Sequence, residues 1–517
     1  MRRYGRTPGA LLLYCVLATT ATFGADARDA LQKAALLVQQ GRLDEADQQA
    51  RLALADPDTR AAANSVLGTI RFQQQRLPES VVFLQKAIEL EPRLLGARLT
   101  LAQVYTLQGR QDKALPLLRQ AIVIDPSNAA SRLALARAET ERGNYSTSLG
   151  LAAPVLPAFH QSPDGLFVLA TNYLKTKNKS SAAALAAKWN ALPNVPQEWS
   201  VKFAVILLQG GVVPEAIGVL ERAKQVGPPS FELDFNLAGA YLLNGDAARA
   251  LETYDEALAV KPDSVAALQQ AAVTAERTGQ LERSLSYWIR AKKLAPDTPE
   301  VLLGFGRVCL KMDLLDDAEP ALARAAVLKP NELTYQYTLA VAKVGKREFE
   351  AAQQLLEPLA AARPDDSGLQ YGLGAVLYVQ GHLAEASARL KDSVRLQPDQ
   401  LAAPYYLALA ERDQGHDAVA IGILRALLQR HPEHAASYEV LGGLLMTAQK
   451  YEEAEVNLQK AVQLNPKSVK ANYQLGLLLA RLGRKEEADK QLALAKTLRQ
   501  DDEATSRLQL RLIEPTP

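Results

Sequence analysis

The side chains that most often carry catalytic or metal-binding chemistry are few in this sequence, and they are poorly grouped. Its 517 residues include five histidines and two cysteines. His382 and His416 lie in adjacent copies of a repeated segment, and His431 and His434 flank Pro432. Neither pair has a cysteine or a further histidine nearby, which a zinc site would need. We therefore predict that the protein holds no metal.

Carboxylates occur in adjacent pairs, but their positions predict a structural role. Asp316-Asp317 and Glu452-Glu453 each fall in the first turn of an expected helix, where acidic side chains are stabilised by the helix dipole. The sequence has no glycine-rich phosphate loop, nucleophile elbow, zinc motif or dinucleotide-binding fingerprint. An enzyme would need such a constellation, so we predict a protein that is not an enzyme and uses no cofactor.

Aromatic side chains recur at a fixed spacing that suits binding. Tyr337, Tyr371 and Tyr405 are each 34 residues apart, and Tyr406 follows the last. If the repeating units are ~10 Å apart, the rings would meet an extended peptide at about every third residue. The alternative is that tyrosine is common at this place of the repeat and forms a generic wall. The predicted partner-binding row comprises Tyr337, Tyr371, Tyr405, Tyr406, Tyr473 and Phe235.

A repeat of 34 residues positions this row. In residues 231–262, two amphipathic segments, 234–243 and 247–260, flank the turn sequence Asn-Gly-Asp. Two helices of about 14 residues cannot bury both apolar faces alone, so the copies must stack on one another. The prolines that close successive copies are Pro262, Pro296, Pro330, Pro364, Pro398, Pro432 and Pro466.

These residues resemble the tetratricopeptide repeat. The matching residues of one copy are Leu237, Ala238, Tyr241, Gly245, Ala250, Tyr254, Ala257 and Pro262, and those of another are Leu101, Ala102, Tyr105, Gly109, Ala114, Leu118, Ala121 and Pro126. The resemblance implies an all-α solenoid, a right-handed superhelix of about fourteen helix-turn-helix repeats with a C-terminal capping helix. It also implies that the first helices line the concave wall, where a ligand binds.

Small residues are expected where the two helices of a repeat meet. Glycine or alanine at the eighth place and alanine at the twentieth place allow helix axes to approach to about 8–10 Å. The alanines predicted to form this seam are Ala114, Ala250, Ala318, Ala386, Ala454 and Ala488.

The repeats account for nearly all of the chain. We expect three regular units over residues 27–126, three irregular units over residues 129–229 and eight regular units over residues 231–500, followed by a cap helix and tail over residues 501–517. Pro154 and Pro157 interrupt the irregular part, and its links are expected to vary in length. Two interpretations of that part remain: a bend or hinge, or divergent repeats in an unbroken solenoid.

The N-terminus differs from the repeats. Three arginines precede an apolar run at residues 10–18, and small residues follow to Gly24. This order is typical of a secretory signal peptide over residues 1–24, with cleavage near residues 24–27. The run is too short for a spanning helix, although an uncleaved membrane anchor is the alternative. Removal of the signal leaves Cys309 as the one thiol, which we interpret as a buried core residue.

Composition narrows the expected partners. The chain has 59 basic and 57 acidic residues and a net charge of +2, so no basic patch for nucleic acid or an anionic membrane stands out. We predict an exported scaffold of the bacterial periplasm or cell surface that binds other proteins, in the context of exopolysaccharide export or surface-protein sorting. Contact with a membrane would come through partners or an uncleaved signal. The alternatives are a carbohydrate-polymer-binding protein and an accessory arm of an enzyme on another chain.

Overall fold

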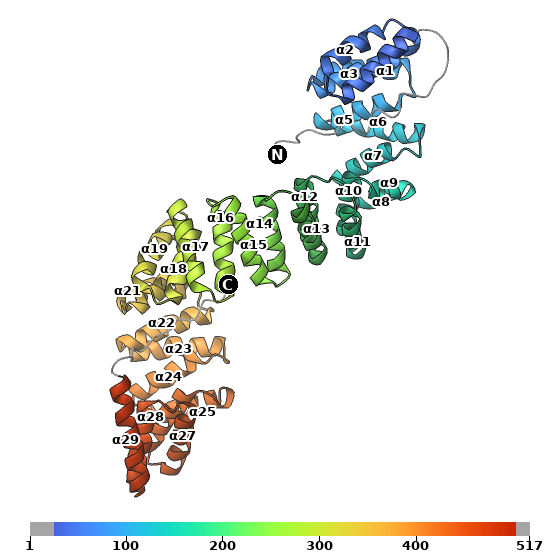
Figure 1. Cartoon of the computed structure of the whole chain (residues 1–517). Coiled ribbons are helices and arrows are strands. Elements are labelled where there is room, and N and C mark those ends of the chain that lie inside the picture. The colour runs from blue at the N-terminus through green and yellow to red at the C-terminus, as the bar shows by residue number, and fades with distance from the viewer. Residues whose placement is uncertain (1–24, 503–517) are drawn as a thin grey trace. The chain divides into compact units, whose positions relative to one another are not determined.

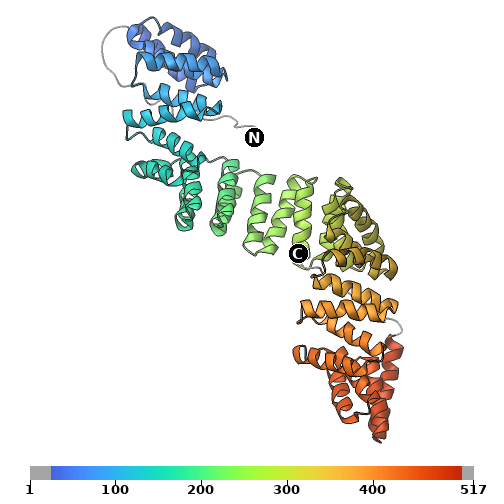
Figure 2. The ribbon, with the colours of Figure 1, turned by 180° about the vertical axis from the view of Figure 1, so that it is seen from behind.

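The computed structural model describes residues 25–502, and every regular element within that range is a helix. The predicted all-α fold of stacked helical hairpins is confirmed. The predicted signal peptide (residues 1–24) and nearly all of the predicted cap and tail (residues 501–517) lie outside the described residues. The chain divides into two compact units, Met1–Pro262 and Asp263–Pro517 (Figures 1 and 2).

The first unit is a row of helical hairpins with one interruption after α8. Its helices are α1 (Ala25–Gln39), α2 (Leu43–Leu52), α3 (Pro57–Gln73), α4 (Leu77–Leu90), α5 (Leu95–Leu107), α6 (Gln111–Ile124), α7 (Ala129–Glu141), α8 (Tyr145–Ala152), the 3-10 helix η1 (Ala153–Val155), α9 (Leu156–His160), α10 (Pro163–Lys175), α11 (Lys179–Asn190), α12 (Gln197–Gln209), α13 (Val213–Val226), α14 (Phe231–Leu243) and α15 (Ala247–Val260).

The second unit repeats the hairpin without interruption. Its helices are α16 (Val265–Arg277), α17 (Leu281–Leu294), α18 (Pro299–Lys311), α19 (Leu315–Leu328), α20 (Leu333–Gly345), α21 (Phe349–Ala362), α22 (Ser367–Gln380), α23 (Leu383–Leu396), α24 (Ala402–Asp413), α25 (Asp417–Arg430), α26 (Ala435–Thr447), α27 (Tyr451–Leu464), α28 (Val469–Arg481) and α29 (Lys485–Asp502). Helix α29 continues without a break past Gln500, where the sequence predicted the last repeat to end.

The turn inside each hairpin holds the repeat in register. One turn residue in every hairpin has a positive φ, and these residues follow one another at intervals of 34 from Gly41 to Gly483. The interval is kept over residues 129–229 too, although the links between hairpins there differ in length as expected, with residues 191–196 joining α11 to α12 and residues 227–230 joining α13 to α14. Most of the turn residues are glycines, which adopt this conformation without strain. The exceptions in this series are Gln75, Lys177, Asp313, Arg347 and Gln449.

The seam between paired helices is closed by small residues. All six alanines predicted for it are buried. Glycine at the eighth place has the same effect: a Cβ added to Gly442 would lie 2.6 Å from Cγ of Leu458 on the facing helix. Ordinary carbon contacts need about 3.5–4.0 Å, so a larger residue would force α26 and α27 apart.

The irregular part of the first unit is continuous with its neighbours. Helix α8 is only 8 residues long, and the chain then turns through η1 and α9 because Pro154 and Pro157 remove backbone donors. Phe159 of α9 is buried against Gly165, where an added Cβ would lie 2.3 Å from the Phe159 carbonyl oxygen. One hydrophobic cluster runs from Ala136 to Ala250. This packing favours divergent repeats in an unbroken stack over a hinge.

In the second unit, the first helix of each hairpin lies on one side. The closest approaches between alternate helices join first helices, namely α16 with α18, α18 with α20, α22 with α24, and α26 with α28. No pair of second helices in this unit approaches as closely. We call the surface formed by α20, α22, α24, α26 and α28 the first-helix wall.

Candidate partner-binding surface

The structure places the predicted tyrosine row at very different depths in the first-helix wall. Tyr337 and Tyr371 are only 2% and 1% exposed. Tyr405 and Tyr406 are partly buried, and Tyr473 on α28 is 50% exposed. In this arrangement a partner would touch the row mainly at Tyr405, Tyr406 and Tyr473. The role of the row in binding stays a prediction, and the structure narrows the residues that would perform it.

Phe235 lies in the other unit and in a different setting. It is partly buried on α14, where its ring stacks on Phe231 at 5.6 Å between centroids and lies edge-on to Tyr254 at 5.8 Å. Lys261 lies 5.3 Å above the Phe231 ring. Phe235 therefore belongs to a local aromatic group of the first unit.

Tyr406 is the centre of an aromatic cluster on the wall. Its ring lies edge-on to three neighbours, with centroid distances of 6.0 Å to Tyr371, 5.8 Å to Tyr378 and 5.8 Å to Tyr405. The ring of His434 lies 5.1 Å from Tyr405 on the other side. Edge-on aromatic pairs at these distances are favourable beyond the area they bury. The cluster joins α22, α24 and the start of α26 into one surface, which we call the tyrosine cluster.

A hydrogen-bonded ion pair borders the tyrosine cluster on α24. The Tyr378 hydroxyl donates to Oδ2 of Asp413 at 2.8 Å, and Arg412 Nη2 lies 2.7 Å from Oδ1 of Asp413. Burial by itself would raise the pKa of Asp413, but the hydrogen bonds from Arg412 and Tyr378 hold it below its usual value. Asp413 therefore stays charged, and its side chain remains 33% exposed.

A second acid lies on α26. The Ser468 hydroxyl donates to Oε2 of Glu439 at 2.7 Å, and Lys470 Nζ lies 3.2 Å from Oε1 of the same carboxylate. Burial, and after it the charge of Glu439, raises the pKa of Tyr405 to about 12. The Tyr405 hydroxyl thus remains protonated at physiological pH and is able to donate a hydrogen bond to a ligand.

The arrangement presents aromatic faces between two partly exposed polar groups. Such a surface suits a segment with apolar side chains toward the rings and polar groups toward Asp413 and Glu439. Sequence reasoning missed Tyr378, Arg412 and Asp413 because it examined only the fifth place of each repeat. The twelfth and thirteenth places also lie on the wall, at the ends of α22 and α24, and a search of all wall places would have found them.

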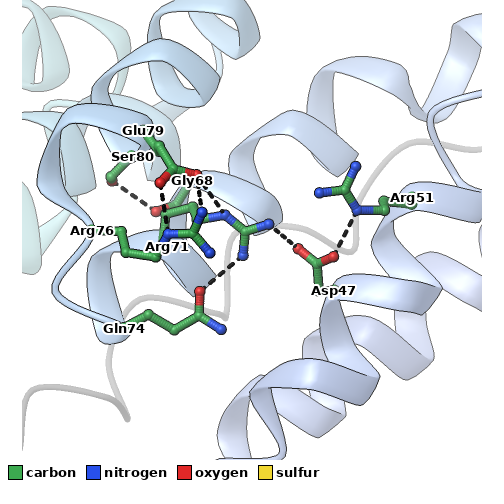
Figure 3. Close-up of polar contacts among 8 residues, drawn as sticks. All are labelled: Asp47, Arg51, Gly68, Arg71, Gln74, Arg76, Glu79 and Ser80. Carbon is green, nitrogen blue, oxygen red and sulfur yellow. Dashed lines mark hydrogen bonds and ion pairs between the residues drawn. The ribbon is translucent and has the colours of Figure 1, made fainter.

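A buried arginine in the first unit has a structural role. Figure 3 shows Arg71 of α3, which is 5% exposed, reaching from its own helix to neighbouring ones. Its Nη2 donates to Oδ1 of Asp47 at 2.5 Å, and its Nη1 donates to Gln74 at 2.9 Å. Its Nε lies 3.4 Å from Glu79 of α4. These contacts tie α2, α3 and α4 together, so the cluster joins one repeat to the next.

The same place of the repeat makes similar links elsewhere. It holds Arg71, Glu139, Lys343 and Glu411, where three other copies have Tyr105, Tyr173 and Tyr241, and each of these charges pairs with the preceding hairpin. Lys343 lies 2.6 Å from Glu319, and Glu411 lies 2.7 Å from Lys391. Burial would raise the pKa of Glu411, but hydrogen bonds from Lys391, His416 and Ser387 lower it. These pairs give the charges at this place of the repeat a structural role.

The remaining reactive side chains form no site among residues 25–502. No cluster of three or more metal-ligating side chains occurs within that range. Cys309 is buried, and burial raises the pKa of its thiol to about 11. His416 Nδ1 lies 2.9 Å from Glu411, and His434 Nδ1 lies 2.7 Å from the Ser437 hydroxyl. In the same described part of the chain, no helix combines the length and apolar character needed to cross a membrane.

Comparison with solved structures finds distant likenesses. A crystal structure of the APC/C hetero-tetramer Cut9-Hcn1 is 14% identical over 86% of this chain and 95% of that chain, with a TM-score of 0.38. A tetratricopeptide repeat protein from Parabacteroides merdae is 17% identical over 48% and 99%, with a TM-score of 0.35. MamA is 22% identical over 32% and 97%, with a TM-score of 0.30. No curated protein matches the sequence.

Family models match the sequence in both units. Models described as tetratricopeptide repeat match residues 95–138, 201–265, 337–400, 376–435, 405–457 and 469–502, and one described as TPR repeat matches residues 442–483. Together they cover a little over half of the chain, and the helical hairpins and their 34-residue register agree with them. Repeats of this kind serve in general as scaffolds for protein interaction. The chain belongs to the tetratricopeptide repeat family.

Proposed function

We propose that this scaffold binds an extended segment of a partner protein along the first-helix wall of its second unit. The observation that carries the proposal is the tyrosine cluster, which presents partly exposed rings of Tyr405 and Tyr406 between the carboxylates of Asp413 and Glu439. Aromatic side chains with a polar tip are enriched where proteins bind one another. The binding requires no catalytic group.

The chemistry of the wall defines the partner segment. Alternate side chains of an extended chain point the same way and lie about 6.6 Å apart. Apolar side chains at that spacing would contact Tyr405, Tyr406 and, further along, Tyr473. Asp413 and Glu439 are already paired with Arg412 and Lys470, so they would orient the segment through hydrogen bonds more than attract it over a distance.

We also propose that the protein is exported to the periplasm or cell surface of a bacterium, where its partners are envelope or export proteins. The support is the basic and apolar order of residues 1–24. Fractionation of the source cells and N-terminal sequencing of the mature protein test this step. A mature protein that still begins at Met1 in the cytoplasm would contradict it.

Affinity capture from the envelope fraction, followed by mass spectrometry, identifies the partner, and titration with that partner then tests the wall. Tyr405→Ala and Tyr473→Ala are expected to weaken binding at least about tenfold each if these rings are anchors. Tyr438→Ala is the matched control, because Tyr438 lies on α26 but lines a shallow pocket with Val456 and Gln459 of α27. Equal binding by all three variants, or capture of polysaccharide alone, would refute the proposal.

A further inference from the structure

One turn in the first unit carries a local excess of positive charge. The whole chain is nearly balanced, with 59 basic and 57 acidic residues, but residues 165–197 include four lysines and no acidic residue. Three of the four, Lys175, Lys177 and Lys179, lie at alternate positions where α10 ends, the chain turns and α11 begins. All three side chains are exposed, so the turn presents three positive charges to solvent.

The helix dipole explains only one of these charges. Lys175 lies in the last turn of α10, where a cation is stabilised, but Lys179 is the first residue of α11, where a cation is disfavoured. Most second helices have an acidic residue in their first turn, as α13 has Glu215, whereas α11 has none. The other two charges therefore have no explanation in local helix chemistry.

No acidic side chain neutralises the three lysines. Within residues 25–502 none of them forms an ion pair, whereas on the neighbouring hairpins Arg137 pairs with Asp164 and Lys224 pairs with Asp234. Like charges held close together repel one another and lower the stability of a compact fold. The group therefore does not stabilise the turn, and its chemistry points to an anionic ligand.

The next hairpin extends the positive surface. Lys179 lies beside the turn between α12 and α13, where a Cβ added to Gly211 would be 2.8 Å from its Nζ. That turn, residues 209–213, has no charged side chain of its own. Helix α12 lies next to α10 (Figure 1) and adds a fourth exposed cation, Lys202. We call Lys175, Lys177, Lys179 and Lys202 the lysine cluster.

An aromatic ring adjoins the lysine cluster on α12. The Nζ of Lys202 lies 5.8 Å from the centroid of the Trp199 ring, and this ring lies edge-on to Phe167 of α10 at 5.7 Å. Trp199 is partly buried, so part of its surface is open to contact. A ligand at this place would meet cations together with an aromatic surface for one apolar side chain.

The size of the lysine cluster favours an acidic protein segment as the ligand. Duplex nucleic acid is typically bound through about 6–10 phosphate contacts, more than four lysines supply. Helices that lie on membranes combine basic and apolar side chains, but the residues between the turn lysines are Thr176 and Asn178. A short run of carboxylates on a protein segment matches a few ammonium groups, and repeats of this family serve as scaffolds for proteins.

We propose that the lysine cluster binds an acidic segment of a partner protein, with an apolar side chain of that segment against Trp199. The proposed function uses the first-helix wall of the second unit, so this site goes beyond it and its test is independent. Charge complementarity of this kind speeds association and selects among partners more than it adds affinity. The first unit thereby selects partners that carry an acidic segment.

A peptide titration of the full chain tests the site. A fluorescein-labelled decapeptide of alternating glutamate and serine is bound to the parent and to the triple variant Lys175→Gln, Lys177→Gln and Lys179→Gln, and anisotropy is measured at low salt. One exposed ion pair changes an equilibrium roughly two- to fivefold, so the triple variant is expected to bind about tenfold more weakly. Added salt should weaken binding to the parent more than binding to the variant.

The triple variant is expected to fold, because other copies of the repeat have glutamine at the same places. These are Gln73, Gln449 and Gln111, and Gln449 has the same positive φ as Lys177. Thermal unfolding checks that the variant is as stable as the parent or more stable.

A second triple variant controls for the change in net charge. Lys485→Gln, Lys490→Gln and Lys496→Gln remove three exposed lysines from α29, and this chain should bind the peptide within about twofold of the parent. Equal binding by the parent and the first triple variant, or an equal loss in both variants, would overturn the inference. Tighter binding of a short DNA duplex or of phosphatidylglycerol vesicles than of the peptide would also overturn it.

Discussion

Two aromatic clusters, one in each unit, show two uses of the same repeat. In the first unit, Trp189 stacks on Phe203 with centroids 4.1 Å apart and planes within 6° of parallel, and Phe167 lies edge-on to both. The indole nitrogen of Trp189 donates inward to the Ser200 hydroxyl at 3.1 Å. In the second unit, the tyrosine cluster turns polar groups toward the wall, where Tyr378 donates to Asp413.

The difference follows from the polar group that each ring carries. Trp189 and Phe203 are 2% and 0% exposed, and they fill the space beside the proline-containing link between α11 and α12. Tyrosines bury their rings but need a partner for each hydroxyl, and Asp413 supplies one at the wall surface. An aromatic side chain of the repeat therefore serves the core where its neighbours are hydrocarbons, as at Phe203, and serves the wall where its neighbours are charged, as at Tyr378.

The largest effect should come from the seam that both clusters depend on. Ala250→Arg in the first unit and Ala454→Arg in the second each place a long charged side chain at a position that is 0% exposed. Overpacking and the buried charge should together lower the free energy of unfolding by about 3 kcal/mol or more. Urea unfolding followed by hydrogen exchange in each unit measures the loss. A variant that unfolds like the parent would show that its alanine is not in the seam.

Removal of one ring from each cluster tests the comparison directly. Trp189→Ala should cost about 3–5 kcal/mol, because it empties a fully buried site. Tyr405→Ala should cost about half as much or less, since its ring is only partly buried and water can replace part of its contacts. The same unfolding measurement applies to both. Equal losses would mean that the tyrosine cluster is core and not wall.

Acid should weaken the tyrosine cluster through Asp413. Its pKa is lowered in the folded chain, so the stability it contributes is complete above about pH 5 and is lost as the pH falls through the folded value, below about 3.9. The carboxylate is one-third exposed, so the effect should be at most about 1 kcal/mol. Parallel pH titrations of unfolding for the parent and Asp413→Asn should converge at low pH. A constant difference between them would contradict the assignment.

The smallest effects are expected at the hairpin turns. Gln449 in the second unit adopts φ +58°, and Gly245 in the first adopts φ +83°. Gln449→Gly should stabilise the fold by about 0.5 kcal/mol, because the relief of backbone strain slightly exceeds the entropy that glycine adds to the unfolded chain. Gly245→Gln should destabilise the fold by about 1 kcal/mol, because glutamine is strained at a positive φ. Thermal unfolding of both variants gives the two signs. A change of stability in the same direction for both variants would show that the left-handed backbone conformation does not determine which residue is favoured at these positions.

Much of the fold could be predicted because the same sequence pattern recurs in each copy of the repeat. The 34-residue period, the closing prolines and the seam alanines identify hairpins that must stack. The 34-residue period locates the five non-glycine turn residues, such as Arg347, but only the structure shows that they adopt the left-handed conformation. In the irregular part, prolines interrupt the chain after α8 and the links differ in length, as the sequence predicted, yet the flanking turns keep the 34-residue interval.

The candidate surface was only partly predictable. The 34-residue spacing places Tyr337, Tyr371 and Tyr405 in one row. Their exposure to solvent nevertheless differs, because it depends on side chains from other hairpins. Tyr378, Arg412 and Asp413 became visible only when α22 and α24 lay side by side. Spacing along a chain gives the direction of a side chain, whereas its depth is set by what packs over it.

By itself, the sequence determined that this chain forms helical hairpins, where each hairpin turns and which small residues line its seam, because these follow from local helix geometry repeated in register. The tertiary structure alone decided which aromatic rings are core and which are wall, and which charges bridge one hairpin to the next. The physical reason is that each hairpin buries its apolar surface only against its neighbours, so the surroundings of any side chain are supplied by residues about 34 positions away.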